Sequence, residues 1–210
     1  VYVEAGVACP KLARFCARNQ LTGAEFLAGI PGTLGGALAM NAGAFGGEIW
    51  PLVRTVETID ESGTRRRRAP EDYRIAYRSV QGPQREWFVA AQIELQRSSD
   101  SSATVRIKEM LERRAATQPM GEASCGSVFR NPPGDYAGRL IEACGLKGYC
   151  IGGACVSSKH ANFIVTRGAS ATAGDIEALI EFVAQAVFEQ HGVRLKTEVC
   201  IVGHKLGERS

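Results

Sequence analysis

The glycine-rich segment from Gly29 to Gly47 constrains the fold of this chain more than any other feature. It reads GIPGTLGGALAMNAGAFGG, so small residues outnumber bulky ones. Backbone without large side chains can approach a ligand closely, and successive N–H groups in such turns bind phosphate oxygens. The segment is neither a P-loop, since no Gly-Lys-Ser/Thr follows, nor a GxGxxG loop behind a βαβ strand. Two interpretations remain open: backbone binding of a ligand, or a tightly packed turn and short helix.

The composition is that of an ordinary globular protein, with 210 residues, 45% of them hydrophobic and 22% charged. This length suits one large domain or two small ones. No apolar run approaches the roughly 20 residues that span a bilayer, so we expect no membrane insertion. The net charge is only +3, and the one basic run, Arg65–Arg68, has no interleaved aromatic residues. We predict a solvated strand edge there and no nucleic-acid partner.

The seven cysteines are odd in number and scattered, and none forms a CxxC pair. A zinc site is therefore not favoured, and we expect no metal. Most of the cysteines lie in apolar surroundings, where free cysteine acts as a small hydrophobe, as in a reducing cytoplasm. The first residues, VYVEAG, have neither part of a signal peptide and resemble the middle of a strand. We expect a cytoplasmic protein that is a fragment of a longer chain.

Hydrophobic periodicity and turn residues predict an α+β protein with two domains that meet near residue 120. The clearest helix covers 173–191, where Thr172 and Asp175 form a capping box and Gly192 ends the helix. The pattern indicates strands first and a βαβ-like unit second. Further helices are predicted at 10–19, at 103–116 and just before Gly145, and strands at 1–3, 53–59, 87–95, 162–166 and 193–202.

Three short patterns carry groups that could perform chemistry. In the first, Arg74, Ala76 and Arg78 alternate with apolar residues, so the arginines are either exposed on a strand or turned inward to hold a carboxylate or enolate. In the second, Ser127 lies in a loop without the GxSxG elbow, where it could still donate a proton to a carbanion. In the third, Glu198 interrupts an apolar strand and is either solvated or buried for acid–base work.

The order of these patterns is more specific than any one of them. Gly-Ile-Pro-Gly-Thr-x-Gly-Gly-Ala and Asn-Ala-Gly-Ala are followed by Tyr-Arg-x-Ser, Gly-Ser-x-Phe-Arg-Asn-Pro, Gly-Leu-Lys-Gly, Ser-x-Lys-His-Ala-Asn-Phe and Glu-Val. This series, which runs from Ala5 to Gly203, resembles the UDP-N-acetylenolpyruvoylglucosamine reductase family. The Ser-x-Lys-His-Ala-Asn-Phe form resembles the second, shorter type of that family.

The resemblance implies a domain arrangement. Residues 1–118 would form the remainder of a vanillyl-alcohol-oxidase-like FAD-binding domain, and 119–194 a smaller α+β substrate-binding domain. Residues 195–210 would be a final strand and tail that return toward the FAD-binding region. In the family another glycine-rich loop, ending in Gly-Ser-Asn, precedes this part and holds the FAD pyrophosphate. Nothing here matches that loop, so we expect the N-terminal part of the FAD domain to be missing.

The resemblance also implies an activity in peptidoglycan precursor synthesis. NADPH reduces FAD, and a hydride then passes to C3 of the enolpyruvyl ether of UDP-N-acetylglucosamine, whose C2 is protonated to give UDP-N-acetylmuramate. Ser127 matches the family's proton donor, and Arg78 and Glu198 match the pair that stabilises the enolate. We expect UDP-N-acetylenolpyruvoylglucosamine and NADPH as small-molecule ligands and a monomeric protein.

The remaining matches concern ligand contacts. Those to the flavin are Pro31, Gly32, Gly35, Gly36, Asn41, Ala42, Gly43 and Ala44. Those to the substrate are Arg130, Asn131, Lys147, His160 and Asn162. The chain departs from the family at Cys125, where alanine is common, and at Cys155, where glutamine is common.

Two rival hypotheses are an oxidase of the wider vanillyl-alcohol-oxidase-like fold and a non-catalytic module that binds a UDP-sugar. The oxidase would need a residue for covalent flavin attachment and a different second domain. The module would be expected to lack Arg78, Ser127 or Glu198, and all three are present. Flavin absorbance of the purified protein would separate both enzymes from the module.

Overall fold

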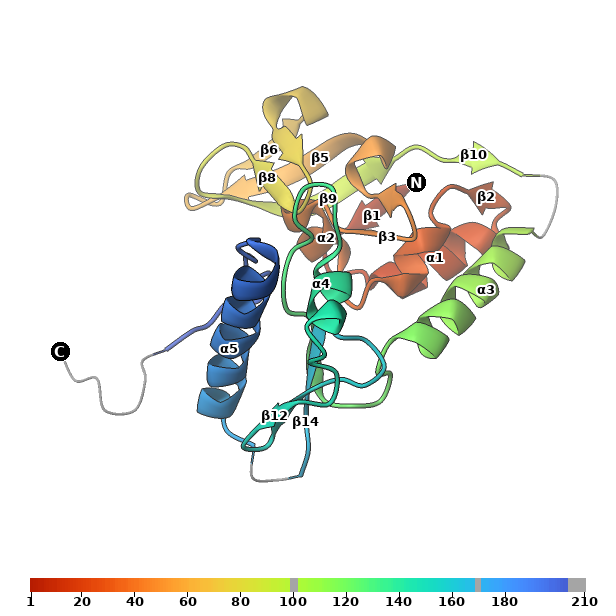
Figure 1. Ribbon diagram of the computed structural model, residues 1–210. Coiled ribbons are helices and arrows are strands. Elements are labelled where there is room, and N and C mark those ends of the chain that lie inside the picture. Colours follow the sequence, from red (N-terminus) through yellow and green to blue (C-terminus); the bar gives the residue numbers. More distant parts are fainter. Residues whose placement is uncertain (99–101, 169–170, 204–210) are drawn as a thin grey trace. The chain divides into compact units, whose positions relative to one another are not determined.

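The computed structural model describes residues 1–98, 102–168 and 171–203, in two compact units, Val1–Arg114 and Ala115–Ser210 (Figure 1). Both units combine helices and sheets, so the predicted α+β class is confirmed. The elements of the first unit are β1 (Tyr2–Glu4), α1 (Cys9–Arg18), β2 (Leu21–Thr22), η1 (Glu25–Gly29), α2 (Leu34–Met40), β3 (Gly43–Ala44), β4 (Gly47–Glu48), η2 (Trp50–Leu52), β5 (Val53–Asp60), β6 (Arg65–Arg68), η3 (Pro70–Asp72), β7 (Arg74–Ala76), β8 (Ser79–Gln81), β9 (Glu86–Ile93), β10 (Gln96–Arg97) and α3 (Ser102–Thr117).

The first unit is built on an antiparallel sheet with the strand order β1-β9-β5-β6. Alternation along β5 and β9 places Val56 and Ala91 in the core, where they pack with the apolar residues of α1 and α2. In α1 the buried face is formed by Cys9, Leu12, Ala13 and Cys16. Phe15 is 53% exposed, because its position lies at the border of this buried stripe.

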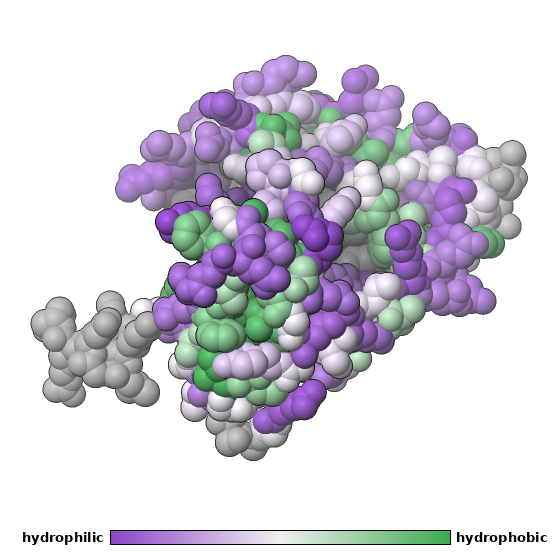
Figure 2. All heavy atoms as spheres, viewed as in Figure 1, coloured by the Kyte–Doolittle hydropathy of each residue, from purple (hydrophilic) through white to green (hydrophobic). Residues whose placement is uncertain are grey.

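Strand β6 is the charged edge of this sheet. Arg68 forms an ion pair with Glu86 at 2.5 Å, and Arg66 pairs with Asp60 at 2.9 Å. Hydrophilic side chains accordingly gather over the β5–β6 region (Figure 2). Charged residues on an edge strand discourage pairing with other chains. The prediction of a solvated strand edge at 65–68 is thus confirmed.

Helix α3 is attached to the rest of the first unit by a partly buried ion pair. Glu25, only 7% exposed, accepts hydrogen bonds from Arg106 Nη2 at 2.5 Å and from Arg106 Nε at 3.1 Å. Thr22 and the backbone N–H of Gly23 also donate to this carboxylate. Farther along α3, Arg114 Nη1 donates to the carbonyl of Gly29 at 2.8 Å. These contacts fix the chain just before the glycine-rich segment.

The second unit contains a sheet with the order β11-β14-β13-β12 and two helices. Every pairing in this sheet is antiparallel, so the predicted βαβ-like unit is wrong. Strands β12, β13 and β14 follow one another through short connections, such as the turn at Gly152 and Gly153. Among the described residues of this unit, the one helix between strands, α4, connects β11 to β12, which are not neighbours in the sheet. The elements are β11 (Ser124–Ser127), α4 (Ala137–Ala143), β12 (Cys150–Ile151), β13 (Ala154–Val156), β14 (Phe163–Thr166) and α5 (Ala173–His191).

Helix α5 has the predicted bounds and both predicted caps. Thr172 and Asp175 form the capping box, and Gly192 ends the helix in the left-handed conformation with φ of 68°. Its apolar stripe is buried against the sheet through Leu179, Ile180, Val183 and Val187. No helix among the described residues is both long enough and apolar enough to cross a membrane.

Two predictions about the second unit are wrong. Residues 193–203 form no strand, because their backbone pairing among the described residues is limited to the short segment 128–130, with one β-bridge between Phe129 and Thr197. Residues 204–210 of the predicted tail lie outside the described part of the chain. Cys150 and Cys155 form a disulfide rather than acting as free thiols, because the β12–β13 hairpin sets them directly opposite each other.

Candidate active site

Within the glycine-rich segment, helix α2 is started and stopped by defined contacts. Thr33 caps its first turn by accepting a hydrogen bond from the N–H of Gly36 at 3.5 Å. The N–H of Gly35 donates to the carbonyl of Ala5, which anchors the turn beside β1. Asn41 ends the helix in the left-handed region with φ of 43°. A β3–β4 hairpin follows, so the segment is a turn, a short helix and a hairpin.

The glycines of this segment are of two kinds. A Cβ on Gly29 or Gly47 would lie 2.5 Å or 2.6 Å from the ring of Phe45 or Phe26, and one on Gly43 would lie 2.5 Å from a backbone oxygen. Those three glycines are required by packing. At Gly32, by contrast, a Cβ would meet no atom within 4 Å, and at Gly36 it would meet only Thr33 at 3.8 Å. The turn that opens α2 therefore has room on its surface for a ligand to approach the backbone.

Asn41 lies at the centre of a buried hydrogen-bond network and is 2% exposed. Its Nδ2 donates to Glu48 Oε2 at 2.8 Å and to the carbonyl of Ala76 at 3.2 Å. Its Oδ1 accepts from the N–H of Trp50 at 3.5 Å. The carboxamide thus joins the end of α2 to β4 and β7. Sequence analysis did not single out Glu48, although a glutamate directly after the paired glycines was the available signal.

Arg78 lies in a turn and not on a strand face as predicted. Strands β7 and β8 form a hairpin, and Tyr77 and Arg78 are the two residues of its turn because Ala76 already pairs with Ser79. Arg78 has a φ of 52°, a conformation that costs a non-glycine residue on the order of 1 kcal/mol. Its Nη2 donates to the carbonyl of Gly43 at 3.2 Å. The structure thereby brings Arg78 to the glycine-rich segment.

Ser127 and Glu198 both belong to the second unit, and the short segment after β11 brings them near each other. The N–H of Glu198 donates to the carbonyl of Val128 at 2.8 Å, and the N–H of Arg130 donates to the carbonyl of Lys196 at 2.9 Å. Glu198 is therefore held beside the residue that follows Ser127. Both side chains are half-buried, whereas Cys125, in the same strand, is exposed.

Two predicted substrate residues, Asn162 and Asn131, form side-chain hydrogen bonds with backbone groups: Asn162 with Phe129, and Asn131 with Ala137. Asn162 is 4% exposed and pairs with both the N–H and the carbonyl of Phe129. Asn131 Oδ1 accepts from the N–H of Ala137 at 3.1 Å and so satisfies the first backbone donor of α4. Between them, Arg130 has a buried Nε without a hydrogen-bond partner among the described residues. Such an atom is suited to an anionic ligand.

His160 and Lys147 lie near each other in the second unit. Burial lowers the pKa of His160, and the positive charge of Lys147 lowers it further. The backbone N–H of Asn162 donates to His160 Nδ1 at 3.2 Å, so the neutral imidazole carries its proton on Nε2. Lys147 Nζ pairs with Glu142 at 2.6 Å. His160 is thus a neutral hydrogen-bond donor beside a cation, a pair suited to oxygen atoms of an anionic ligand.

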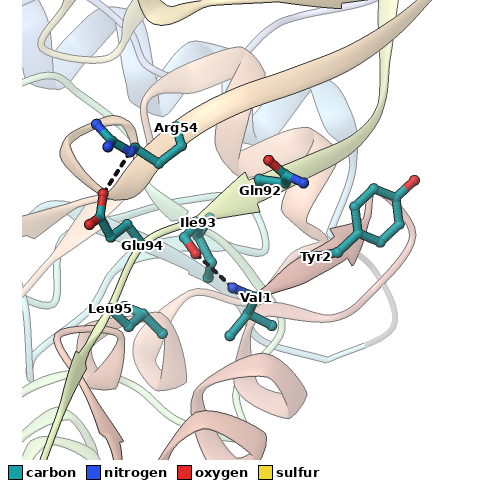
Figure 3. Close-up of a pocket in the computed structure, with 7 residues that line it drawn as sticks. All are labelled: Val1, Tyr2, Arg54, Gln92, Ile93, Glu94 and Leu95. Atoms are coloured by element: carbon teal, nitrogen blue, oxygen red, sulfur yellow. Dashed lines mark hydrogen bonds and ion pairs between the residues drawn. The ribbon is translucent and has the colours of Figure 1, made fainter.

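A surface hollow in the first unit is lined by none of the predicted site residues (Figure 3). It lies over β1 and the ends of β5 and β9, where Arg54 pairs with Glu94 at 2.7 Å. Both partners are largely exposed, so this ion pair contributes little to stability. The hollow has no buried polar group directed into it and is not a candidate active site. Within the described ranges no cluster of histidine, cysteine and acidic residues is arranged to hold a metal.

Comparison with known proteins accounts for both units. Residues 1–68 match the model of a family described as an FAD binding domain, and residues 118–202 match that of the UDP-N-acetylenolpyruvoylglucosamine reductase C-terminal domain. Two relatives named UDP-N-acetylenolpyruvoylglucosamine reductase, from Alkalilimnicola ehrlichii and Methylococcus capsulatus, are 62% and 61% identical over 97% of this chain. The chain spans 68% and 66% of their lengths, about two thirds.

A solved structure agrees with these sequence relationships. The crystal structure of UDP-N-acetylenolpyruvylglucosamine reductase from Thermus caldophilus has a TM-score of 0.82 and 35% identity to this chain. The match covers 94% of this chain and 71% of that one. The chain therefore belongs to the UDP-N-acetylenolpyruvoylglucosamine reductase family, FAD-dependent oxidoreductases of peptidoglycan precursor synthesis.

Proposed function

We propose that this chain carries the catalytic residues of an NADPH-dependent reductase that converts UDP-N-acetylenolpyruvoylglucosamine to UDP-N-acetylmuramate. Arg78, Ser127 and Glu198 are the proposed catalytic residues. The single observation that carries the proposal is the 2.8 Å hydrogen bond from Glu198 N–H to the Val128 carbonyl, which holds Glu198 next to the Ser127 segment. An acid and a proton-donating hydroxyl, both half-buried, therefore lie on two adjacent segments of the chain.

The flavin fits the open part of the glycine-rich segment. Gly32 and Gly36 leave room for close approach, and Pro31, Gly35, Asn41, Ala42, Gly43 and Ala44 complete the proposed flavin-binding residues. Asn41 would act there by fixing the loop, since its carboxamide is bonded within the protein. When bound, FAD supplies hydride-transfer chemistry, with NADPH as the reductant.

Arg78 would balance the negative charge that develops on the substrate. A guanidinium beside the enolpyruvyl carboxylate stabilises an enolate, a preorganised effect that is worth several kcal/mol, about 3 when one donor is removed. The hydrogen bond from Arg78 Nη2 to the carbonyl of Gly43 supports such a role, because it holds the guanidinium beside the proposed flavin-binding segment. Arg130, Asn131, Lys147 and His160 are the proposed substrate-binding set, whereas both polar atoms of the Asn162 side chain are bonded to Phe129.

Ser127 would donate the proton that C2 of the substrate receives. A hydroxyl is a weak acid, so it needs a neighbour that stabilises its oxygen or relays a proton. Glu198 would act together with Arg78 to stabilise the enolate that forms in the same reaction. Reduction of the double bond is then complete, with the hydride at C3 and the proton at C2.

The domain assignment proposed here follows the comparisons in outline. Residues 1–118 would bind the flavin, residues 119–194 would bind the substrate, and the described part of the final segment 195–210, residues 195–203, would return toward the flavin-binding region. A monomeric protein in the cytoplasm completes the proposal. Size-exclusion chromatography with light scattering would test the monomer.

The experiment compares the two half-reactions of the flavin-loaded enzyme, prepared from its complete gene, under anaerobic conditions. In Ser127→Ala, flavin reduction by NADPH should keep its rate, while reoxidation of the flavin by the UDP-sugar should slow by at least about 100-fold. Ser124→Ala, which changes an exposed serine of the same strand, is the matched control and should leave both rates unchanged. Equal behaviour of the two variants would overturn the role of Ser127. A wild-type flavin that the UDP-sugar does not reoxidise would overturn the function.

A further inference from the structure

We infer that Asn162 is a positioning residue for the proton-donor segment and does not itself bind the substrate, an inference that rests on the proposed function. The resemblance places Asn162 among the substrate residues. Its side chain, however, is directed at a neighbouring backbone and is 4% exposed.

The carboxamide of Asn162 is paired with a single residue on both of its sides. Its Oδ1 accepts a hydrogen bond from the N–H of Phe129 at 2.9 Å. Its Nδ2 donates to the carbonyl of Phe129 at 2.8 Å. This is the pattern that a neighbouring strand would make, so the side chain replaces a missing piece of the sheet.

The sheet needs this replacement because its ladder is irregular at this place. Strand β11 pairs with β14 through Ser124 and Ser127, with a shift of register between them, and Gly126 has a φ of 84°. Beyond Ser127 the regular pairing ends, and the next contact is the N–H of Val128 with the Asn162 carbonyl at 2.9 Å. After Ser127, Asn162 therefore takes the place of a strand partner: its backbone carbonyl bonds to Val128, and its side chain bonds to Phe129.

The opposite side of the same segment holds Glu198. The carbonyl of Val128 accepts from the N–H of Glu198, and the N–H of Arg130 donates to the carbonyl of Lys196. Residues 128–130 thus lie between Asn162 on one side and residues 196–198 on the other. Loss of the Asn162 contacts would let residues 128–130 shift, and with them Ser127 and Glu198, the two proposed catalytic residues of the second unit.

Only asparagine satisfies both contacts at this reach. An aspartate of the same size lacks the donor and sets a charged oxygen against the buried carbonyl of Phe129. A glutamine adds a methylene to a side chain that is buried, and a larger side chain at a buried position strains its surroundings. The residue type is therefore explained by the backbone contacts alone, without a ligand.

The test measures hydrogen exchange and the two half-reactions in the flavin-loaded enzyme prepared from its complete gene. In Asn162→Asp, amide exchange across 128–130 should accelerate by at least about tenfold. Flavin reduction by NADPH should keep its rate, whereas reoxidation by saturating UDP-sugar should slow by about 10- to 100-fold. Asn19→Asp is the control, because Asn19 Nδ2 also donates to a backbone carbonyl but is exposed at the end of α1.

Each outcome decides between defined alternatives. Unchanged exchange, with a raised substrate KM and an unchanged rate at saturation, would show direct substrate contact and overturn the inference. Equal slowing of both half-reactions would show general destabilisation and overturn it as well. If Asn162→Asp does not fold, exchange in the wild type decides: Phe129 N–H protected like β14 supports the inference, and Phe129 N–H exchanging like an exposed loop contradicts it. A wild-type enzyme without UDP-sugar reoxidation would refute the proposed function, and the exchange measurement would still stand.

Discussion

The guanidinium of Arg78 donates from Nη2 to the carbonyl of Gly43 at 3.2 Å and so joins the β7–β8 turn to the glycine-rich segment. A second bond, from Asn41 Nδ2 to the carbonyl of Ala76, crosses between the same two regions in the other direction. The proposed charge-balancing arginine and the proposed flavin-binding loop are therefore held together by reciprocal contacts. Each contact can be removed separately.

Arg78→Gly should separate stability from activity. Glycine relieves the left-handed backbone, a gain of about 1 kcal/mol that offsets the lost hydrogen bond to Gly43. We expect a melting temperature within a few degrees of the wild type and at least a 100-fold loss of turnover. Arg85→Gly, which relieves a φ of 58° at an exposed position, should retain full turnover. Retained turnover in Arg78→Gly would contradict the proposed role.

Asn41 should be sensitive to both of its features, its hydrogen bonds and its backbone. Asn41→Gly loses the bonds to Glu48 and Ala76 but retains a compatible φ, whereas Asn41→Ala loses the bonds and also strains the backbone. We expect Asn41→Ala to be the less stable variant by about 1 kcal/mol in urea unfolding. Equal midpoints would show that the left-handed conformation contributes nothing.

Glu25 should make stability depend on acid pH. Burial alone raises the pKa of Glu25, but hydrogen bonds from Arg106, Thr22 and Gly23 together lower it below its usual value. Its contribution is therefore present above the unfolded pKa, about 4.3, and is lost as the pH falls through the lower folded pKa. Glu25→Gln should cost about 2 kcal/mol at pH 7, and the difference should shrink in acid. A difference independent of pH would refute the linkage.

The Cys150–Cys155 disulfide should be detectable by counting free thiols and should contribute modestly to the free energy of unfolding. Alkylation in denaturant should label five of the seven cysteines, and all seven after reduction. The bridge closes a loop with a sequence separation of only 5, so reduction should lower the free energy of unfolding by about 2 kcal/mol. Cys125→Ser, at an exposed free thiol, should leave this difference unchanged. Seven labelled thiols without reduction would contradict the bridge.

The sequence was sufficient to predict elements whose signals are local. Helix α5 has its predicted bounds because its caps, Thr172 with Asp175 and Gly192, lie in the sequence itself. The strand predicted at 193–202 was wrong because strand formation depends on a partner, and only residues 128–130 are there to pair with it. Local pattern cannot reveal such a partner.

The candidate site divides in the same way. The glycine-rich segment and the order of motifs could be read directly, since they are contiguous. The turn at Arg78 and the network of Asn41 with Glu48 could not, because each joins residues that are distant in the chain. Asn162 is the clearest case. Its place in the motif indicated a ligand contact, whereas its side chain is buried and both of its polar atoms are hydrogen-bonded to the backbone of Phe129.

The most direct test of the central claim is anaerobic NADPH oxidation by the flavin-loaded enzyme, with and without UDP-N-acetylenolpyruvoylglucosamine, with the nucleotide product weighed by mass spectrometry. We predict that continuous NADPH oxidation requires the UDP-sugar. The product should be heavier than the substrate by two hydrogens, in an amount equal to the NADPH consumed. NADPH oxidation that reduces the flavin once and then stops, with the UDP-sugar unchanged in mass, would contradict the reductase assignment.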